Sequence, residues 1–150
     1  MSAVPECAAL TLELGEAVPP VRALCVDDNP DNADTTAALL RAMGLVAEAC
    51  YSGTSALQLN DTFRPDVCFL DLNMPGMDGD ELAVELRRVR RWRPKILVAV
   101  TAMSDGDSRR RLAAAAFDVY LVKPVSLEKL DATVMLIHRV IDSYADGDAG

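Results

Sequence analysis

The stretch Val67-Cys68-Phe69-Leu70-Asp71 places four consecutive apolar residues directly before an aspartate. A short apolar run of this length is typical of a strand that is buried on both faces of a sheet. An aspartate at the end of such a strand lies at the edge of the sheet, where the chain meets water. The stretch therefore predicts a buried strand that presents one carboxylate at its carboxyl end.

Four other apolar or β-branched runs of the same kind occur along the chain, and segments with helical spacing separate them. Strict alternation of strands and helices predicts an α/β fold, in which a doubly wound, parallel, five-stranded sheet carries helices on both faces. The four further predicted strands are Val21–Val26, Leu45–Cys50, Ile96–Val100 and Val119–Val122.

Helix start signals support this alternation. Asn29, followed by Pro30 and Asp31, combines an N-cap, a proline at the first helical position and a carboxylate in the first turn. Ser52 and Ser126 are the predicted N-caps of the second and fifth helices. The third and fourth helices are predicted at Gly79–Arg90 and Asp105–Ala115.

The chain of 150 residues predicts one domain. Residues 1–20 carry three glutamates and no basic residue and end in Pro19–Pro20, so we predict an N-terminal extension that is disordered, although a short strand around Thr11–Leu14 is an alternative. Residues 21–144 are the predicted domain and 145–150 a short acidic tail. We expect no DNA-binding module, because so few residues follow the fifth helix.

The charge balance excludes several classes of partner. The chain has 23 acidic and 15 basic residues and a net charge of −8, which argues against general binding to nucleic acid or to anionic membrane. No apolar run is long enough to span a membrane, and the first 20 residues are a poor secretory signal. Cys7, Cys25, Cys50 and Cys68 lack metal-site spacing, so we predict a cytoplasmic protein without disulfides.

Polar residues that could bind a ligand or take part in a reaction follow the predicted strands. Asp27 and Asp28 follow the first strand, Asp71 the third, Thr101 the fourth and Lys123 the fifth. Ligands of such sheets bind at the carboxyl ends of the strands. If the first and third strands are neighbours, three carboxylates converge and require a cation, for which Mg²⁺ suits an all-oxygen site.

These residues stand in motifs that resemble the receiver domain of two-component response regulators. The resemblance covers residues 21–143 and implies a flavodoxin-like sheet with strand order 2-1-3-4-5. The motifs that carry it are Val26-Asp27-Asp28-Asn29-Pro30, Leu70-Asp71-Leu72-Asn73-Met74-Pro75-Gly76-Met77-Asp78-Gly79, Val100-Thr101-Ala102 and Lys123-Pro124.

The resemblance implies a phosphoacceptor switch rather than an enzyme. Asp71 would accept a phosphoryl group from a sensor histidine kinase or a histidine phosphotransfer protein. Mg²⁺, for which Mn²⁺ is a possible substitute, would be held by Asp28, Asp71 and the backbone carbonyl of Asn73, with Asp27 completing the acidic pocket.

The same resemblance implies how the signal leaves the site. Lys123 would pair with the acyl phosphate, and Thr101 would move toward it while Tyr120 swings inward. The family also has a cis peptide at the position of Pro124. The responsive surface would comprise the fourth helix, the fifth strand and the fifth helix, which would bind a downstream protein or a second copy.

The sequence leaves three alternatives open. A haloacid-dehalogenase-type phosphohydrolase also uses an aspartate at a strand end, but it needs a second aspartate where this chain has Asn73. A receiver-fold scaffold without phosphorylation usually lacks part of the acidic set. The chain could also be one piece of a larger hybrid kinase.

Three other features of the sequence lie outside these motifs. His138 is predicted to have a structural or surface role on the fifth helix. The basic run Arg87–Lys95 is predicted to be a solvated helix end, with an acidic protein partner as the functional alternative. Leu136, Val140 and Tyr144 recur at four-residue spacing outside the core stripe of that helix and predict a partner-binding face.

Overall fold

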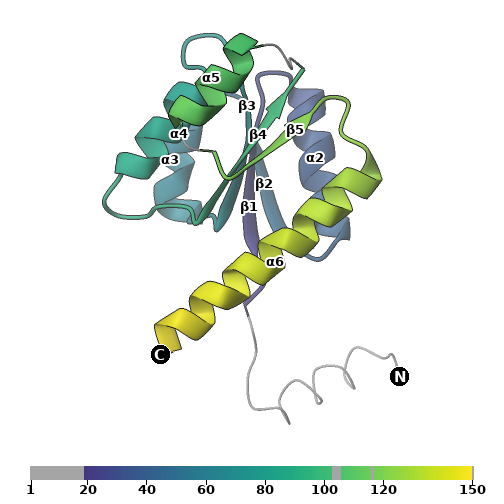
Figure 1. The fold of residues 1–150 in the computed structure, drawn as a ribbon, viewed down its shortest axis with the longest axis vertical. Coiled ribbons are helices and arrows are strands. Elements are labelled where there is room, and N and C mark those ends of the chain that lie inside the picture. The colour runs from purple at the N-terminus through teal and green to yellow at the C-terminus, as the bar shows by residue number, and fades with distance from the viewer. Residues whose placement is uncertain (1–18, 103–105, 116, 150) are drawn as a thin grey trace.

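The structure, a computed structural model, describes residues 19–102, 106–115 and 117–149. Most of the predicted N-terminal extension, including the segment considered as a strand, lies outside the described residues. Strands and helices alternate along the described chain (Figure 1). Their order is β1 (Arg22–Val26), α2 (Pro30–Ala42), β2 (Val46–Cys50), α3 (Gly53–Phe63), β3 (Val67–Asp71), α4 (Gly79–Arg88), β4 (Ile96–Thr101), α5 (Gly106–Ala115), β5 (Val119–Val122) and α6 (Leu127–Ala149).

The five strands form one parallel sheet in the order β2-β1-β3-β4-β5, as predicted. The chain passes from β1 outward to β2 and then returns to β3 on the other side of β1. Val26 at the end of β1 is in register with Leu70, the residue before Asp71. The strand order therefore reverses between the two strands that carry the aspartates.

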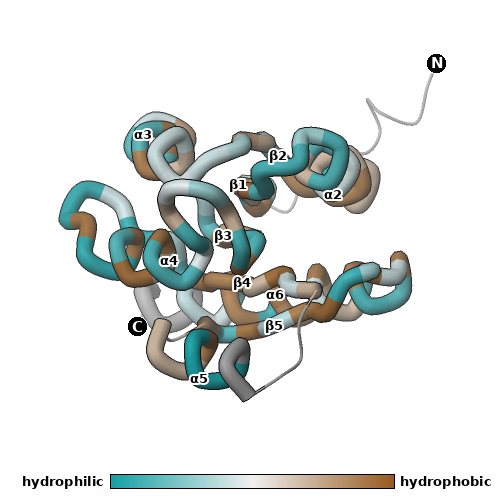
Figure 2. The backbone as a smooth tube through the Cα atoms, turned by 90° about the horizontal axis from the view of Figure 1, so that it is seen from above, coloured by the Kyte–Doolittle hydropathy of each residue, from teal (hydrophilic) through white to brown (hydrophobic). Residues whose placement is uncertain are grey.

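Helices cover both faces of the sheet (Figure 2). Helices α2 and α6 pack on one face through Ala37, Leu40, Leu130, Val134 and Ile137, all buried against β-strand side chains. Helices α3, α4 and α5 cover the other face, where the core includes Ala56, Phe63, Leu82, Ala83, Leu86 and Ala115. Strands β3 and β4 are apolar up to their last residues because both faces of the sheet are covered there, whereas the edge strands β2 and β5 expose Glu48 and Tyr120.

The predicted helix caps are present. The side chain of Asn29 accepts from the Asp31 N–H at 3.0 Å, and Ser52 Oγ accepts from the Ser55 N–H at 3.1 Å. Ser126 Oγ likewise accepts from the Lys129 N–H at 3.1 Å at the start of α6. Each hydroxyl or amide oxygen satisfies one of the N–H groups that a first helical turn leaves without a backbone partner.

Two helix ends differ from the prediction. Helix α4 ends at Arg88 rather than Arg90, because Val89 is extended with φ −63° and ψ 145°. Helix α6 continues to Ala149, so the backbone of residues 145–149, predicted as a tail, is helical. Among the described residues, no helix combines the length and the apolar character needed to cross a membrane.

Hydrogen bonds around Trp92 explain the early end of α4. The indole Nε1–H donates to the carbonyl of Pro65 at 2.6 Å, and Asn60 Nδ2 donates to the carbonyl of Trp92 at 2.8 Å. Arg64 and Lys95 lie over the Trp92 ring, at 5.7 and 5.4 Å from its centroid. These contacts hold the loop after α4 against the loop before β3, at the amino ends of the strands.

Candidate functional site

Three carboxylates meet where the strand order reverses. Each of Asp27, Asp28 and Asp71 offers a carboxylate oxygen that lies within 4.8 Å of those of the other two. Asp27 and Asp71 are buried, whereas Asp28 is exposed. The pairing of β1 with β3 produces this arrangement, because the two aspartate-bearing strands end side by side at one edge of the sheet.

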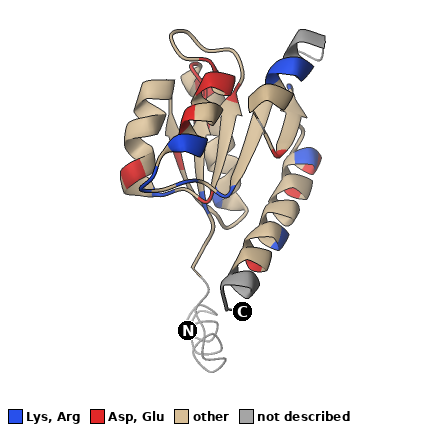
Figure 3. Ribbon diagram, turned by 60° about the vertical axis from the view of Figure 1, so that its left-hand side comes forward, with Lys and Arg blue, Asp and Glu red and all other residues tan. Residues whose placement is uncertain are grey.

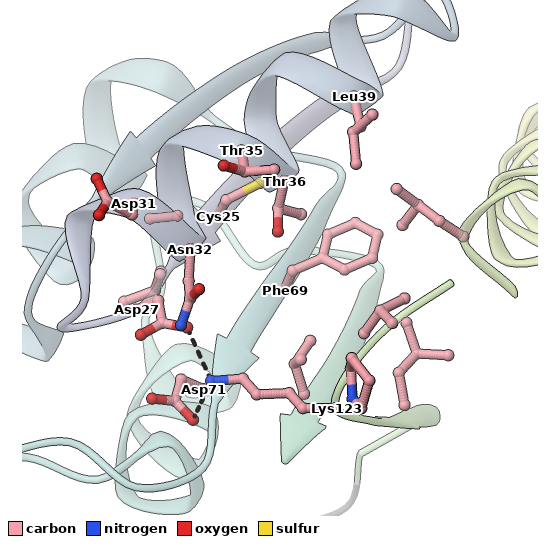
Figure 4. A pocket seen from close by; sticks show the side chains of 17 residues that line it. Cys25, Asp27, Asp31, Asn32, Thr35, Thr36, Leu39, Phe69, Asp71 and Lys123 are labelled. Carbon is pink, nitrogen blue, oxygen red and sulfur yellow. Dashed lines mark hydrogen bonds and ion pairs between the residues drawn. The ribbon is translucent and has the colours of Figure 1, made fainter. Parts of the chain in front are cut away.

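A lysine from a distant part of the chain completes the group. Lys123 Nζ lies 3.0 Å from Asp27 Oδ2 and 3.4 Å from Asp71 Oδ1 (Figure 4). The Lys123–Pro124 peptide bond that follows is cis, as the resemblance implied. Burial acts to lower the pKa of Lys123, but the hydrogen bond to Asp27 and the charges of both aspartates outweigh it and raise the pKa. The side chain is therefore an ammonium that faces two carboxylates.

The charge of Asp71 is only partly compensated. Burial raises its pKa, the charge of Asp27 raises it further, and Lys123 and the backbone N–H of Asn73 lower it, with a net value of about 6. Three carboxylates and one ammonium leave an excess of negative charge. A divalent cation with oxygen ligands fits this donor set, and receiver domains generally bind Mg²⁺ at such an acidic pocket.

The loop after β3 lies tightly against the end of that strand. The Gly79 N–H donates to the carbonyl of Leu72 at 3.0 Å, and the Met74 N–H donates to Asp78 Oδ1 at 2.9 Å. A Cβ atom at Gly79 would collide with the backbone oxygen of Asp71. Glycine at this position therefore lets the amino end of α4 approach the site closely.

The predicted switch residues lie on the two neighbouring strands. Thr101 ends β4 and is fully buried, and its carbonyl accepts from the Lys123 N–H at 2.7 Å. Tyr120 lies on the edge strand β5 with 61% of its surface exposed. The structure thus brings Thr101 to the same edge of the sheet as Asp71 and leaves Tyr120 on the surface.

A cavity of about 460 Å³ adjoins the carboxylates on the α2 side of the sheet. Figure 4 shows Asp27, Asp71 and Lys123 at one end of it and apolar side chains, including Phe69 and Leu39, farther inside. The Asp71 side chain therefore lines one end of this cavity.

One residue near the site was not predicted from the sequence. Arg111, on α5, donates from Nη1 to Asn73 Oδ1 at 2.9 Å and from Nη2 to the carbonyl of Leu72 at 3.1 Å. It also forms a two-pronged pair with Asp80, from Nη2 to Oδ1 at 2.9 Å and from Nε to Oδ2 at 3.1 Å. Nothing in the run Arg109-Arg110-Arg111 distinguishes this arginine from its neighbours.

The remaining sequence features lie away from the carboxylates. His138 is exposed on α6. The basic run Arg87–Lys95 lies at the amino ends of the strands, and Figure 3 shows its positive residues along the loop at that end. Cys25, Cys50 and Cys68 are buried and free, as predicted, and burial raises the pKa of the Cys25 thiol to about 12. Cys7 lies outside the described residues.

The fold and the site together define a doubly wound α/β domain. At the point where its strand order reverses lies an acidic pocket with a lysine beside the carboxylates. Residues 23–135 match the family model described as the response regulator receiver domain. The chain therefore belongs to the receiver domain family of two-component systems.

Individual relatives agree with this assignment. The chain is 37% identical over 117 residues to the sensor histidine kinase GacS of Pseudomonas protegens, covering 76% of this chain and 13% of that protein. The chemotaxis protein CheY4 of Vibrio cholerae superposes with a TM-score of 0.74 at 25% identity, over 79% of this chain and 99% of that one. A CheY-like receiver domain from Methylobacillus flagellatus gives 0.69 at 30% identity, over 79% and 99%. The chain thus spans about an eighth of the length of the sensor kinase.

Proposed function

We propose that this receiver domain accepts a phosphoryl group on Asp71 from a histidine kinase or a histidine phosphotransfer protein. The observation that carries the proposal is the Asp71 carboxylate, held at a strand end with the Lys123 ammonium 3.4 Å away and two further carboxylates beside it. Phosphoryl transfer depends mainly on such positioning and charge stabilisation.

The proposed transfer is a displacement at phosphorus. A carboxylate oxygen of Asp71 forms the new O–P bond while the P–N bond of the donor phosphohistidine breaks, and the electron pair of that bond stays on the imidazole. Lys123 pairs with the phosphoryl oxygens. Mg²⁺, for which Mn²⁺ is a possible substitute, would be held by Asp28, Asp71 and the backbone carbonyl of Asn73 beside Asp27, and would neutralise charge on the transferring group.

The proposed output is a change in protein–protein association. In this proposal Thr101 contacts the phosphoryl group, and Tyr120 leaves its exposed position and turns inward. The responsive surface comprises α5, β5 and α6, which binds a downstream protein or a second copy of the chain. The buried, unpaired thiols of Cys25, Cys50 and Cys68 suit a cytoplasmic location.

The site residues favour this proposal over the phosphohydrolase and scaffold alternatives. In the phosphohydrolase alternative, an acidic group two residues after the nucleophile must donate a proton. Asn73 is an amide, and its Oδ1 is bound by Arg111. The scaffold alternative does not account for the complete set of Asp27, Asp28, Asp71, Thr101 and Lys123 at one edge of the sheet.

The direct test is phosphorylation by acetyl phosphate and Mg²⁺, followed by intact-mass measurement and peptide mapping. We expect one added phosphoryl group, located on Asp71, in the parent protein and none in Asp71→Asn. Asp61→Asn, which removes an exposed carboxylate on α3, is the matched control and should be labelled like the parent. Equal labelling of parent and Asp71→Asn would refute the proposal.

A further inference from the structure

Among the described residues, the side chain of Arg111 connects helix α5 to the loop after β3. Only 24% of its side-chain surface is exposed. Its guanidinium reaches Asn73, Leu72 and Asp80, and its Nη2 also lies 3.4 Å from Asp78 Oδ2. A bidentate arginine–carboxylate pair fixes the plane of the guanidinium, so the groups bonded to it are fixed as well.

The peptide between Leu72 and Asn73 is held at its carbonyl by two hydrogen bonds. Its carbonyl, from Leu72, accepts from Arg111 Nη2 at 3.1 Å and from the Gly79 N–H at 3.0 Å. Its N–H, from Asn73, lowers the pKa of the Asp71 carboxyl and so acts on that carboxylate electrostatically. Displacing the peptide would therefore also displace the N–H dipole that acts on Asp71.

The side chain of Asn73 is held by the same guanidinium. Its Oδ1 accepts from Arg111 Nη1 at 2.9 Å. The backbone of Asn73 therefore has little freedom to rotate, because its peptide and its side chain are bonded to one rigid group. The carbonyl of Asn73, which the proposed function assigns to the cation, lies in this restrained segment.

We propose that Arg111 is a positioning residue that fixes the Leu72–Asn73 peptide beside Asp71 and thereby links occupancy of the phosphoacceptor site to the position of helix α5. The proposal rests on the proposed function of Asp71. It adds a connection that runs through the loop after β3 and does not involve Thr101 or Tyr120. Coupling of this kind is reciprocal: an ion or phosphoryl group at Asp71 restrains α5, and α5 in place strengthens binding at Asp71.

The first measurement is the affinity for Mg²⁺ by titration calorimetry. We expect Arg111→Gln to bind Mg²⁺ roughly five- to tenfold more weakly than the parent, within the usual range for coupled sites. Arg109→Gln makes the same change of charge at an exposed position on the same helix and should bind like the parent. Asp80→Asn, which leaves Arg111 in place but removes its two-pronged partner, should weaken binding in the same direction.

The second measurement is hydrogen exchange of α5 with and without Mg²⁺ and beryllofluoride, a mimic of the phosphoryl group. We expect the backbone amides of α5 to become more protected on addition in the parent and in Arg109→Gln, and to respond at most weakly in Arg111→Gln. If Arg111 only stabilised α5, its loss would speed exchange by the same factor with and without the ligands. The increase in protection on ligand addition would then be the same in Arg111→Gln as in the parent.

The outcomes separate the two proposals. If the parent takes up no phosphoryl group from acetyl phosphate, the proposed function of Asp71 is wrong. If the parent is labelled but Arg111→Gln matches Arg109→Gln in Mg²⁺ affinity and in the α5 response, the role of Arg111 is wrong. Unfolding of each variant in urea shows whether it is folded, and Asp80→Asn provides the same comparison should Arg111→Gln fail to fold.

Discussion

Ionisation of Asp71 lowers the free energy of unfolding of the protein. Its pKa of about 6 exceeds the ordinary value of 3.8, chiefly because the carboxyl is buried and lies beside Asp27. The folded state therefore binds the Asp71 proton more tightly than the unfolded state does. This residue makes the free energy of unfolding fall as the pH rises from 3.8 to about 6, and the loss persists at higher pH.

Asp71→Asn should therefore stabilise the protein at pH 7.5 in the absence of divalent cations. We expect its melting temperature to exceed that of the parent by roughly 2–4 °C, as for a gain of about 1 kcal/mol in a domain of this size. Near pH 4 the difference should shrink, because the parent carboxyl is then mostly protonated. Added Mg²⁺ should raise the melting temperature of the parent more than that of Asp71→Asn. Scanning calorimetry at the two pH values checks both expectations.

Asp28 differs from its two neighbours because it is the exposed member of the group. As a proposed ligand on the solvent side, it can be replaced without leaving a buried cavity. We expect Asp28→Asn to weaken Mg²⁺ binding by about tenfold or more and to change the melting temperature little. Titration calorimetry gives the affinity, with Asp61→Asn as the control. An unchanged affinity in Asp28→Asn would exclude it as a ligand.

The loop between β3 and α4 contains two glycines, and a different physical constraint favours glycine at each position. Gly76 has φ +82° and open space around the position of a Cβ atom, so a side chain there is disfavoured by backbone conformation alone. Gly79 has no such constraint, but a Cβ atom would collide with the backbone of Asp71.

The two alanine variants should separate these causes. We expect Gly76→Ala to lower the free energy of unfolding by about 1 kcal/mol and to leave Mg²⁺ affinity unchanged. Gly79→Ala should cost about 3 kcal/mol or more and should also weaken Mg²⁺ binding, because it displaces Asp71 or α4. Urea unfolding and calorimetry on both variants test the assignment. Similar costs for both glycines would contradict it.

The elements themselves were predictable because the buried strands β3 and β4 are nearly continuous apolar runs, and the partly exposed edge strands still read as short apolar or β-branched runs. All five strands lie within one residue of their predicted ends. The end of α4 was not predictable, because Val89 and Arg90 are compatible with a helix. The chain leaves the helix there because Trp92 bonds to Pro65, a contact between residues far apart in sequence.

The same limit applies to the site. Asp27, Asp28, Asp71, Thr101 and Lys123 could be placed at one edge of the sheet, because each follows a strand and parallel strands share that edge. Arg111 could not be found this way, since it lies inside a helix at the end of a run of three arginines. Its role depends on how α5 packs against the loop after β3, which no local pattern encodes.

Helix α6 presents apolar side chains on the surface of the protein, away from the core. Leu136 and Tyr144 are 43% and 48% exposed, as the spacing predicted, whereas Val140 is half-buried and packs against the core. A charge at Val140 would therefore perturb folding as well as association. The surface available to a partner is better tested at Leu136 and Tyr144.

We expect the parent protein to self-associate when Mg²⁺ and beryllofluoride are added, and Leu136→Glu combined with Tyr144→Glu to remain monomeric. Glutamates on the α6 surface would have to be desolvated in an interface. Sedimentation velocity measures this, and Met135→Glu, at another exposed apolar position on α6, is the control. Should the double variant associate like the parent, the contact surface lies elsewhere.

The contacts that hold Trp92 in place make its fluorescence a useful measure of folding. Trp92 is the only tryptophan of the chain, and it lies at the amino ends of the strands, across the full length of the sheet from Asp71. Its indole is bound to Pro65 and so keeps one environment as long as the sheet is intact. We therefore expect its fluorescence to follow unfolding of the sheet and to change little on binding at the carboxylates, which emission spectra with and without Mg²⁺ check. Stability and occupancy can thus be read from one sample, with emission for the first and calorimetry or mass for the second.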